Sequence, residues 1–91
     1  MVRLRQTPTF KRAVKRLHAK QKLDLDAAVR TLGDDPLRGE AKVGDLAGVR
    51  VYKFRMDRHP VLLAYVYQDA DNEIKLLALG SHQNFYRDLK R

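Results

Sequence analysis

The sequence contains no cysteine, which excludes a disulfide framework and any thiolate metal site. It also has no apolar run close to the roughly 18 residues that a membrane-spanning helix needs. The longest such run, residues 61–67, has the length of a strand. No apolar segment follows the basic N-terminal residues as it would in a signal peptide. These absences predict an unexported, cytoplasmic protein without membrane contact.

Acidic residues are scarce in two parts of the chain. The net charge of +8 comes from 19 Lys and Arg against 11 Asp and Glu. Residues 1–23 hold eight basic residues and no acid, and residues 49–68 hold four basic residues and one acid. Concentrated positive charge is typical of a protein that binds a polyanion. We therefore expect a nucleic acid partner, RNA above all, although an acidic protein or a merely basic surface would give the same pattern.

The length of 91 residues allows one domain, spanning residues 1–91. A chain of this size buries only about 60–65% of the surface that it exposes when unfolded. Its core is therefore thin, and a partner that covers apolar surface would contribute to its stability. The hydrophobic content of 44% argues against intrinsic disorder.

The first half of the sequence predicts a strand followed by a helix hairpin. Residues 2–6 alternate apolar and polar side chains, and Thr7-Pro8 is a typical helix start. Helical spacing relates two apolar sets, namely Phe10, Ala13, Val14 and Leu17, then Leu25, Ala28, Val29 and Leu32. Asp24 is the expected N-cap of the second helix, and Gly33 the expected left-handed residue after it. His18 is expected on the exposed side of the first helix.

The second half changes to a period of two, which indicates strands at residues 49–56, 61–68 and 73–79. Turns at residues 58–60 and 69–72 would join them into an antiparallel meander. A last helix is expected from Ser81 to Arg91. The predicted fold is α+β with the order β-α-α-β-β-β-α, a small antiparallel sheet with the helix hairpin packed on one face. The other face is then left open.

The predicted strand at residues 49–56 carries mostly large apolar side chains on one side and basic side chains on the other. Arg50, Tyr52, Phe54 and Met56 share one side, which we assign to the core because most of its members are large and apolar. Lys53 and Arg55 lie on the other side and would form a phosphate-binding pair. The alternative is an ordinary solvated strand face.

The C-terminal segment is the other candidate site. On a helix from Ser81, one face would carry His82, Tyr86 and Lys90, beside an apolar stripe of Phe85 and Leu89. Histidine can transfer protons near neutral pH, although a lone histidine is more often a surface or capping residue. The sequence has no phosphate-binding glycine loop and no metal-ligand spacing among its three histidines. We therefore expect no metal and no cofactor.

Several stretches together resemble a known family, namely Leu46-Ala47-Gly48, Leu63-Ala64-Tyr65 and Gly80-Ser81-His82-Gln83-Asn84-Phe85. With the element order, they resemble the RelE/ParE superfamily, the toxins of bacterial type II toxin–antitoxin pairs. The last stretch is similar to the Gly-Thr-His-x-x-Leu-Phe ending of YafQ-type ribosome-dependent mRNA interferases. The resemblance covers the whole chain.

The resemblance implies a ribosome-dependent mRNA endoribonuclease that cleaves by attack of a ribose 2′-OH and inhibits translation. It implies that the catalytic residues are His82, Arg55 and Tyr86, and that the RNA-binding residues are Lys53, Arg50, Arg87, Lys90, Lys11 and Lys15. The implied partners are a cognate antitoxin, mRNA and the ribosomal A site, with operator DNA bound only through the antitoxin. Leu62 departs from the family pattern, because RelE has an arginine near this place.

Two other functions stay open at this point. A ParE-type poison of DNA gyrase would have the same fold and perform no RNA chemistry. A non-catalytic nucleic-acid-binding domain is the second alternative, and the missing arginine at Leu62 is its best support.

Overall fold

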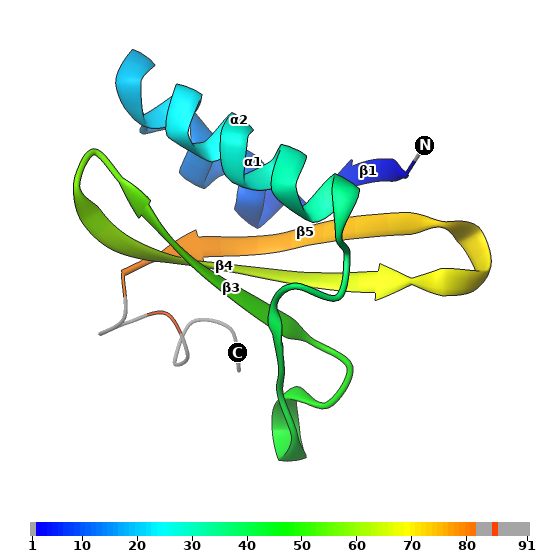
Figure 1. The fold of residues 1–91 in the computed structure, drawn as a ribbon. Helices are drawn as coiled ribbons and strands as arrows, with labels where there is room; N and C mark the ends of the chain where they lie inside the picture. Colours follow the sequence, from blue (N-terminus) through cyan, green and yellow to red (C-terminus); the bar gives the residue numbers. More distant parts are fainter. Residues whose placement is uncertain (1, 82–84, 86–91) are drawn as a thin grey trace.

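The computed structural model describes residues 2–81 and Phe85. In chain order (Figure 1), its elements are β1 (Arg3–Gln6), α1 (Pro8–Lys15), α2 (Ala19–Asp34), β2 (Glu40–Ala41), the 3-10 turn η1 (Gly44–Leu46), β3 (Arg50–Met56), β4 (His59–Gln68), the 3-10 turn η2 (Asp69–Asp71) and β5 (Glu73–Gly80). Most of the predicted last helix, residues 82–84 and 86–91, lies outside the described residues. No helix in the described part of the chain is long and apolar enough to cross a membrane.

The five strands form one sheet with the order β1-β5-β4-β3-β2. The antiparallel meander of β3, β4 and β5 is confirmed. β1, however, pairs with β5 in parallel, so the sheet is mixed and the prediction of a purely antiparallel sheet was wrong in this respect. Alternation along residues 2–6 indicates a strand but carries no information on which distant strand lies beside it.

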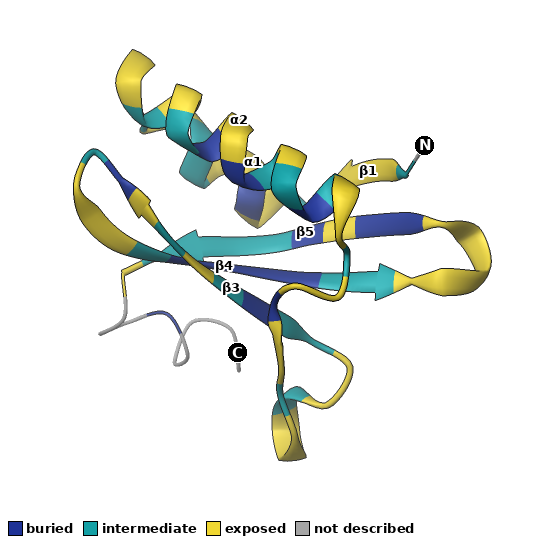
Figure 2. Cartoon of the chain, viewed as in Figure 1, coloured by how far each residue is buried: buried dark blue, intermediate teal, exposed yellow. Residues whose placement is uncertain are grey.

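The helix hairpin covers one face of this sheet, as predicted (Figures 1 and 2). Buried side chains from both layers form the main core, namely Phe10, Leu25, Leu32, Met56, Leu63, Tyr65, Ile74 and Leu76. The α+β class with a helix hairpin on the sheet is therefore confirmed. Each layer buries an apolar face that neither could bury alone.

The boundary between the two helices differs from the prediction. α1 ends at Lys15 and α2 begins at Ala19, with His18 as its N-cap. The His18 backbone N–H donates to Gln21 Oε1 at 3.0 Å, and the Gln21 N–H donates to His18 Nδ1 at 3.4 Å. This reciprocal capping box places the N-cap six residues before Asp24. Asp24 as N-cap was therefore wrong, and so was His18 on the first helix.

Gly33 was also assigned wrongly, because α2 continues through it to Asp34. A Cβ atom at Gly33 would lie 3.4 Å from Val2 Cγ1, so β1 passes close to the helix at this point. Gly33 is therefore a helical residue beside the N-terminal segment, at ordinary contact distance from it, and not a left-handed helix end.

The β3–β4 hairpin turns at Asp57 and Arg58, whose φ angles are 50° and 72°. His59 and Pro60, which we had placed in the turn, belong to β4. Two successive positive φ angles are typical of a two-residue type I′ turn, usually formed by Asn-Gly or Asp-Gly. Asp-Arg is an uncommon pair for this turn, which is why the sequence did not reveal it.

Tyr65 fastens the loop between α2 and β2 to the core. Its hydroxyl donates to the Pro36 carbonyl at 2.7 Å and accepts from the Gly39 N–H at 2.9 Å. Tyr65 itself is fully buried, and burial raises the pKa of its hydroxyl above its usual range. The hydroxyl therefore remains a neutral donor at physiological pH.

Gly39→Ala should destabilise the fold, because the new Cβ atom would lie 2.7 Å from the Tyr65 ring and hydroxyl. We expect a loss of about 1–3 kcal/mol in the free energy of unfolding, as for other overpacked sites. Urea unfolding measures this loss. Ala47→Ser, at an exposed position between η1 and β3, is the control and should change stability by less than about 0.5 kcal/mol. A fully stable Gly39→Ala protein would contradict the packing described here.

Candidate functional site

The alternation of β3 places its side chains as the sequence predicted. Tyr52 and Phe54 are half-buried against the main core, with stacked rings 6.0 Å apart at an interplanar angle of 10°. Lys53 and Arg55 are exposed on the opposite face, which we call the open face. Figure 2 shows this alternation along β3. Two cations thus project side by side from a rigid strand.

The cross-strand partners of these two cations are uncharged. Across the β3–β4 ladder, Lys53 lies opposite Leu62 and Arg55 opposite Pro60. Within residues 2–81, neither cation forms an ion pair with an acid. The Arg55 guanidinium donates one hydrogen bond, from Nη1 to the Arg58 carbonyl at 3.3 Å. Most of its donors are therefore available to an anion.

Strands β5 and β1, toward the opposite edge of the sheet, add more positive charge to the open face. Lys75 on β5 is exposed there, and the parallel register sets Arg5 of β1 beside it. Arg3 lies beside Glu73, the one acid in strands β1, β3, β4 and β5. Glu73 is buried and lies 3.5 Å from the Arg5 guanidinium. The face as a whole is strongly cationic, which favours binding of a polyanion.

A second apolar cluster occupies the middle of the open face. It is formed by Val51, Leu62, Ala64 and Phe85, all buried. Leu62, at the place where RelE has an arginine, is only 5% exposed in this cluster. A cation there would lose its hydration, so packing explains the departure from the family pattern. The open face is thus partly covered, whereas the sequence analysis had left it entirely free.

A polar network fastens the β3–β4 hairpin tip to the start of α2. The Asp57 N–H donates to Asp24 Oδ2 at 2.7 Å, and Lys20 Nζ donates to Asp24 Oδ1 at 2.7 Å. His18 Nε2 lies 3.2 Å from Asp57 Oδ2. These contacts hold the turn at Asp57 and Arg58, which begins two residues after Arg55. Sequence reasoning missed them, since it assigned Asp24 to a helix cap.

A protein-family model described as the ParE-like toxin of type II bacterial toxin–antitoxin systems matches residues 4–90. The chain belongs to this family. This match confirms the RelE/ParE superfamily that the sequence motifs resembled. No curated protein sequence matches the toxin.

Solved structures show the same fold at low identity. The toxin superposes on a chain of the intact RelBE toxin–antitoxin complex of Escherichia coli with a TM-score of 0.76 and 13% identity, covering 91% of this chain and 99% of that one. A toxin–antitoxin complex from Mycobacterium tuberculosis gives 0.64 and 24%, with 89% and 98% covered. The archaeal RelE–RelB complex from Pyrococcus horikoshii gives 0.64 and 17%, with 90% and 96% covered.

The remaining predicted residues of the toxin have different surroundings. Arg50 is engaged with the loop that Tyr65 anchors, because its Nη1 donates to the carbonyls of Gly39 at 2.7 Å and Leu37 at 3.1 Å. Lys11 and Lys15 are exposed on α1, one turn apart. These positions do not test RNA binding, which stays a prediction for all three residues.

His82, Tyr86, Arg87 and Lys90 lie outside the described residues, so their predicted roles also stay predictions. Three further cations that sequence reasoning missed share the open face with Lys53 and Arg55, namely Arg3 and Arg5 of β1 and Lys75 of β5. Arg3 and Arg5 reach the open face through the pairing of β1 with β5, which no local signal reveals, whereas the alternation along β5 places Lys75 there. Among the described residues, no three His, Asp or Glu side chains are grouped as metal ligands.

The network at the hairpin tip predicts an acid-sensitive contribution to stability. The pKa of Asp24 is lowered from its ordinary value of 3.8, chiefly by the hydrogen bond from Lys20 and also by the Asp57 N–H. A carboxyl whose pKa falls on folding stabilises the fold above its unfolded pKa, and this contribution is lost as the pH falls through the folded pKa. Asp24→Asn should therefore be less stable than wild type at neutral pH, and the difference should shrink below pH 3.8 and vanish once the pH has fallen through the lowered folded pKa.

Urea unfolding between pH 2 and pH 7 checks this expectation. Asp26→Asn is the matched control, because it removes the same charge from α2 at an exposed residue for which no hydrogen bond to the described residues is seen. Asp26→Asn should leave the pH dependence of the free energy of unfolding the same as in wild type. Parallel stability curves for Asp24→Asn and wild type would refute a role for the Asp24 carboxylate.

Proposed function

We propose that this toxin is a metal-independent, ribosome-dependent mRNA endoribonuclease. The observation that carries the proposal is the exposed pair Lys53 and Arg55, which has no acidic partner among the described residues and stands on a rigid strand. Beside it, Phe85 is buried on the same face. Phe85 is three residues from His82 and one from Tyr86 in the sequence, which supports a site shared by the strand and the C-terminal segment.

The proposed reaction is an internal transesterification of RNA. A base removes the proton of a ribose 2′-OH, and the 2′-oxygen attacks the adjacent phosphorus. The bond from phosphorus to the 5′-oxygen of the next nucleotide breaks, and an acid protonates that oxygen as it leaves. The products are a 2′,3′-cyclic phosphate and a free 5′-OH. Negative charge develops on the non-bridging oxygens, so fixed cations lower the barrier.

The roles follow from the chemistry of each side chain. His82, with Tyr86, would transfer the protons, since histidine can gain and lose a proton near neutral pH. Arg55 and Lys53 would stabilise the charge on the phosphate oxygens, and a guanidinium can do so through two hydrogen bonds at once. Arg87, Lys90 and Arg50 would contact the RNA, while Lys11 and Lys15 on α1 would contact ribosomal RNA.

We also propose that the toxin acts in the cytoplasm and binds a cognate antitoxin. The RelBE complexes to which the toxin is similar contain an antitoxin, and we propose such a partner here. An acidic antitoxin segment would neutralise the open face, and operator DNA would be bound only through the antitoxin. mRNA and the ribosomal A site are the proposed targets.

A second candidate function is poisoning of DNA gyrase. The description of the matching family as ParE-like favours it. Such a toxin would bind a protein target and would need no proton-transferring histidine. His82 and Tyr86 in the closing segment are the features that favour the ribonuclease.

His82→Ala should abolish mRNA cleavage. A general acid–base group contributes about 10²- to 10⁴-fold to the rate, whereas ribosome binding depends mainly on the cations and should persist. Mapping of mRNA 5′ ends minutes after induction should show cuts in coding regions, in register with the reading frame, for wild type only. Sedimentation with ribosomes checks the binding of both proteins. Equal cleavage by His82→Ala would exclude the assignment of His82.

The same induction experiment separates the competing functions. Growth arrest with intact mRNA and broken DNA would establish a gyrase poison. Normal growth with intact mRNA would establish a non-catalytic binding domain.

Arg55→Gln should slow cleavage by about 10²–10³-fold, the usual cost of removing one preorganised donor to the charge that develops in a transition state. Arg30→Gln removes the same charge from the exposed side of α2 and should cleave at nearly the wild-type rate. Single-turnover cleavage on programmed ribosomes measures both. Similar losses in the two variants would show that Arg55 acts only through net charge.

A further inference from the structure

The outer edge of β1 presents unused backbone hydrogen-bonding groups. In the described part of the chain, β1 pairs only with β5. The N–H groups of Arg3 and Thr7 donate to Asn72 and Leu76 at 2.9 and 3.1 Å, so they point toward β5. Successive N–H groups along a strand point to opposite sides, so those of Leu4 and Gln6 point away from the sheet. An exposed edge of this kind is a template for another strand.

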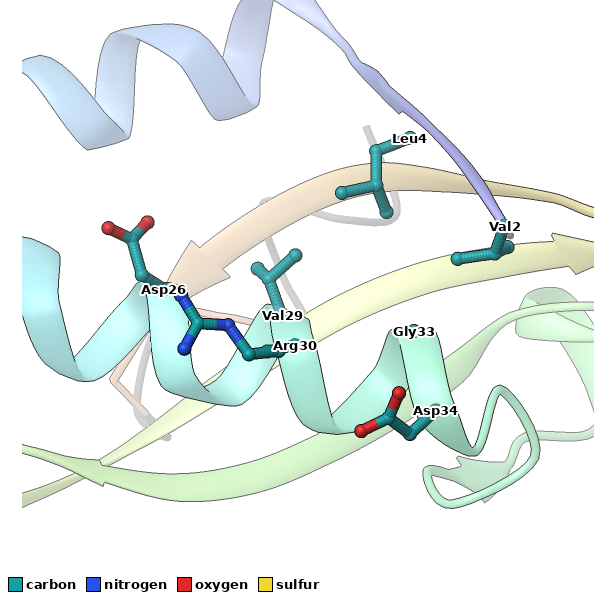
Figure 3. Close-up of a pocket in the computed structure, with 7 residues that line it drawn as sticks. All are labelled: Val2, Leu4, Asp26, Val29, Arg30, Gly33 and Asp34. Atoms are coloured by element: carbon teal, nitrogen blue, oxygen red, sulfur yellow. The ribbon is translucent and has the colours of Figure 1, made fainter.

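A groove runs along this edge, between β1 and α2 (Figure 3). Its volume is about 510 Å³, within the range of about 300–1,000 Å³ that binding pockets occupy. Leu4 of β1 and Val2 just before it line one side, and Val29 and Gly33 of α2 line the other. Leu4 remains 49% exposed. Because Gly33 has no side chain, the groove stays open between the strand and the helix.

The two faces of β1 differ in chemistry. Leu4 points toward the groove, so Arg3 and Arg5 point toward the open face, where both are exposed. A strand added beside β1 would alternate in the same way. Its residues on the groove side would meet Leu4 and Val29, and its residues on the other side would meet Arg3 and Arg5. The complementary segment therefore alternates apolar and acidic residues.

We propose that the antitoxin supplies this segment, an extended stretch of alternating apolar and acidic residues that adds to the edge of β1 and places its apolar side chains in the β1–α2 groove. This is β-strand addition, in which main-chain hydrogen bonds give affinity and pockets for alternate side chains give specificity. The proposal rests on the toxin's family and its proposed antitoxin partner, and it does not depend on ribonuclease activity.

The observations disfavour other occupants of the groove. An antitoxin helix would satisfy its own backbone groups and leave those of Leu4 and Gln6 unused. RNA would bring phosphates to a groove whose rim carries Asp26 and Asp34 along with Arg30. The carboxylates of Asp26 and Asp34 would repel the RNA phosphates there. A strand uses both the edge and the groove.

Titration of the isotope-labelled full chain with a defined peptide tests the proposal. The probe is acetyl-Glu-Val-Glu-Leu-Glu-Val-Glu-amide, and the control replaces each Glu with Lys. We expect saturable NMR shifts at Leu4, Gln6, Val29 and Gly33 with the Glu peptide. Amide hydrogen exchange should slow at Leu4 and Gln6 but not at Arg3 or Thr7, which are already bonded to β5.

Two variants make the test specific. Arg3→Glu should weaken the Glu peptide about tenfold and allow the Lys peptide to bind, a reversal worth about 1.4 kcal/mol. Gly33→Leu should fill the groove and weaken the Glu peptide by a similar factor. Gly33→Ala adds only a Cβ atom at ordinary contact distance from Val2, so it should retain both fold and binding. Circular dichroism checks that all three variants are folded.

The outcomes are decisive in both directions. Failure of the Glu peptide to bind, equal binding of the Lys peptide, or shifts confined to residues away from β1 would overturn the proposal. Displacement of the peptide from β1 by an RNA oligonucleotide would assign the edge to RNA instead. Since no RNA cleavage is measured, failure here leaves the ribonuclease proposal standing, and the reverse also holds.

Discussion

Four consecutive residues of β4, Leu62 to Tyr65, are buried, and their side chains alternate between the two faces of the sheet. Each face therefore has apolar surface that some other part of the chain must cover. The helix hairpin covers one face, where Leu63 and Tyr65 of β4 are fully buried. On the open face, Phe85 covers the patch around Leu62. In a domain with so thin a core, this two-sided burial holds the neighbouring strand β3 in place, and with it the cations at its outer side.

The cations of the open face are exposed because the helix hairpin covers only the opposite face of the sheet. The helix side holds bulky residues such as Tyr52 and Phe54, which orient β3 so that Lys53 and Arg55 project the other way. The hairpin tip beyond Arg55 is fixed from behind by Asp24 of α2. Cations on a supported strand lose little conformational freedom when they meet a phosphate, which is the condition for preorganised charge stabilisation.

Local patterns in the sequence were sufficient for most elements and for the sides of β3. The apolar spacing from Phe10 to Leu32 predicted both helices, and the period of two predicted the meander and the exposure of Lys53 and Arg55. Contacts between distant segments could not be predicted in this way. The partner of β1, the role of Asp24 and the close approach of Val2 to Gly33 depend on tertiary contacts. The α2 cap was missed for a different reason, because histidine is an uncommon N-cap.

The turn at Asp57 and Arg58 has a consequence for how this protein can evolve. A non-glycine residue in the left-handed region costs on the order of 1 kcal/mol or more, and Arg58 has φ 72°. Glycine would relax the backbone there but would remove a positive charge from the end of the cationic strand. Selection for stability thus favours glycine at position 58, whereas selection for positive charge at the end of the strand favours arginine. A homologue with Asp-Gly at this tip should fold more readily and bind polyanions less tightly.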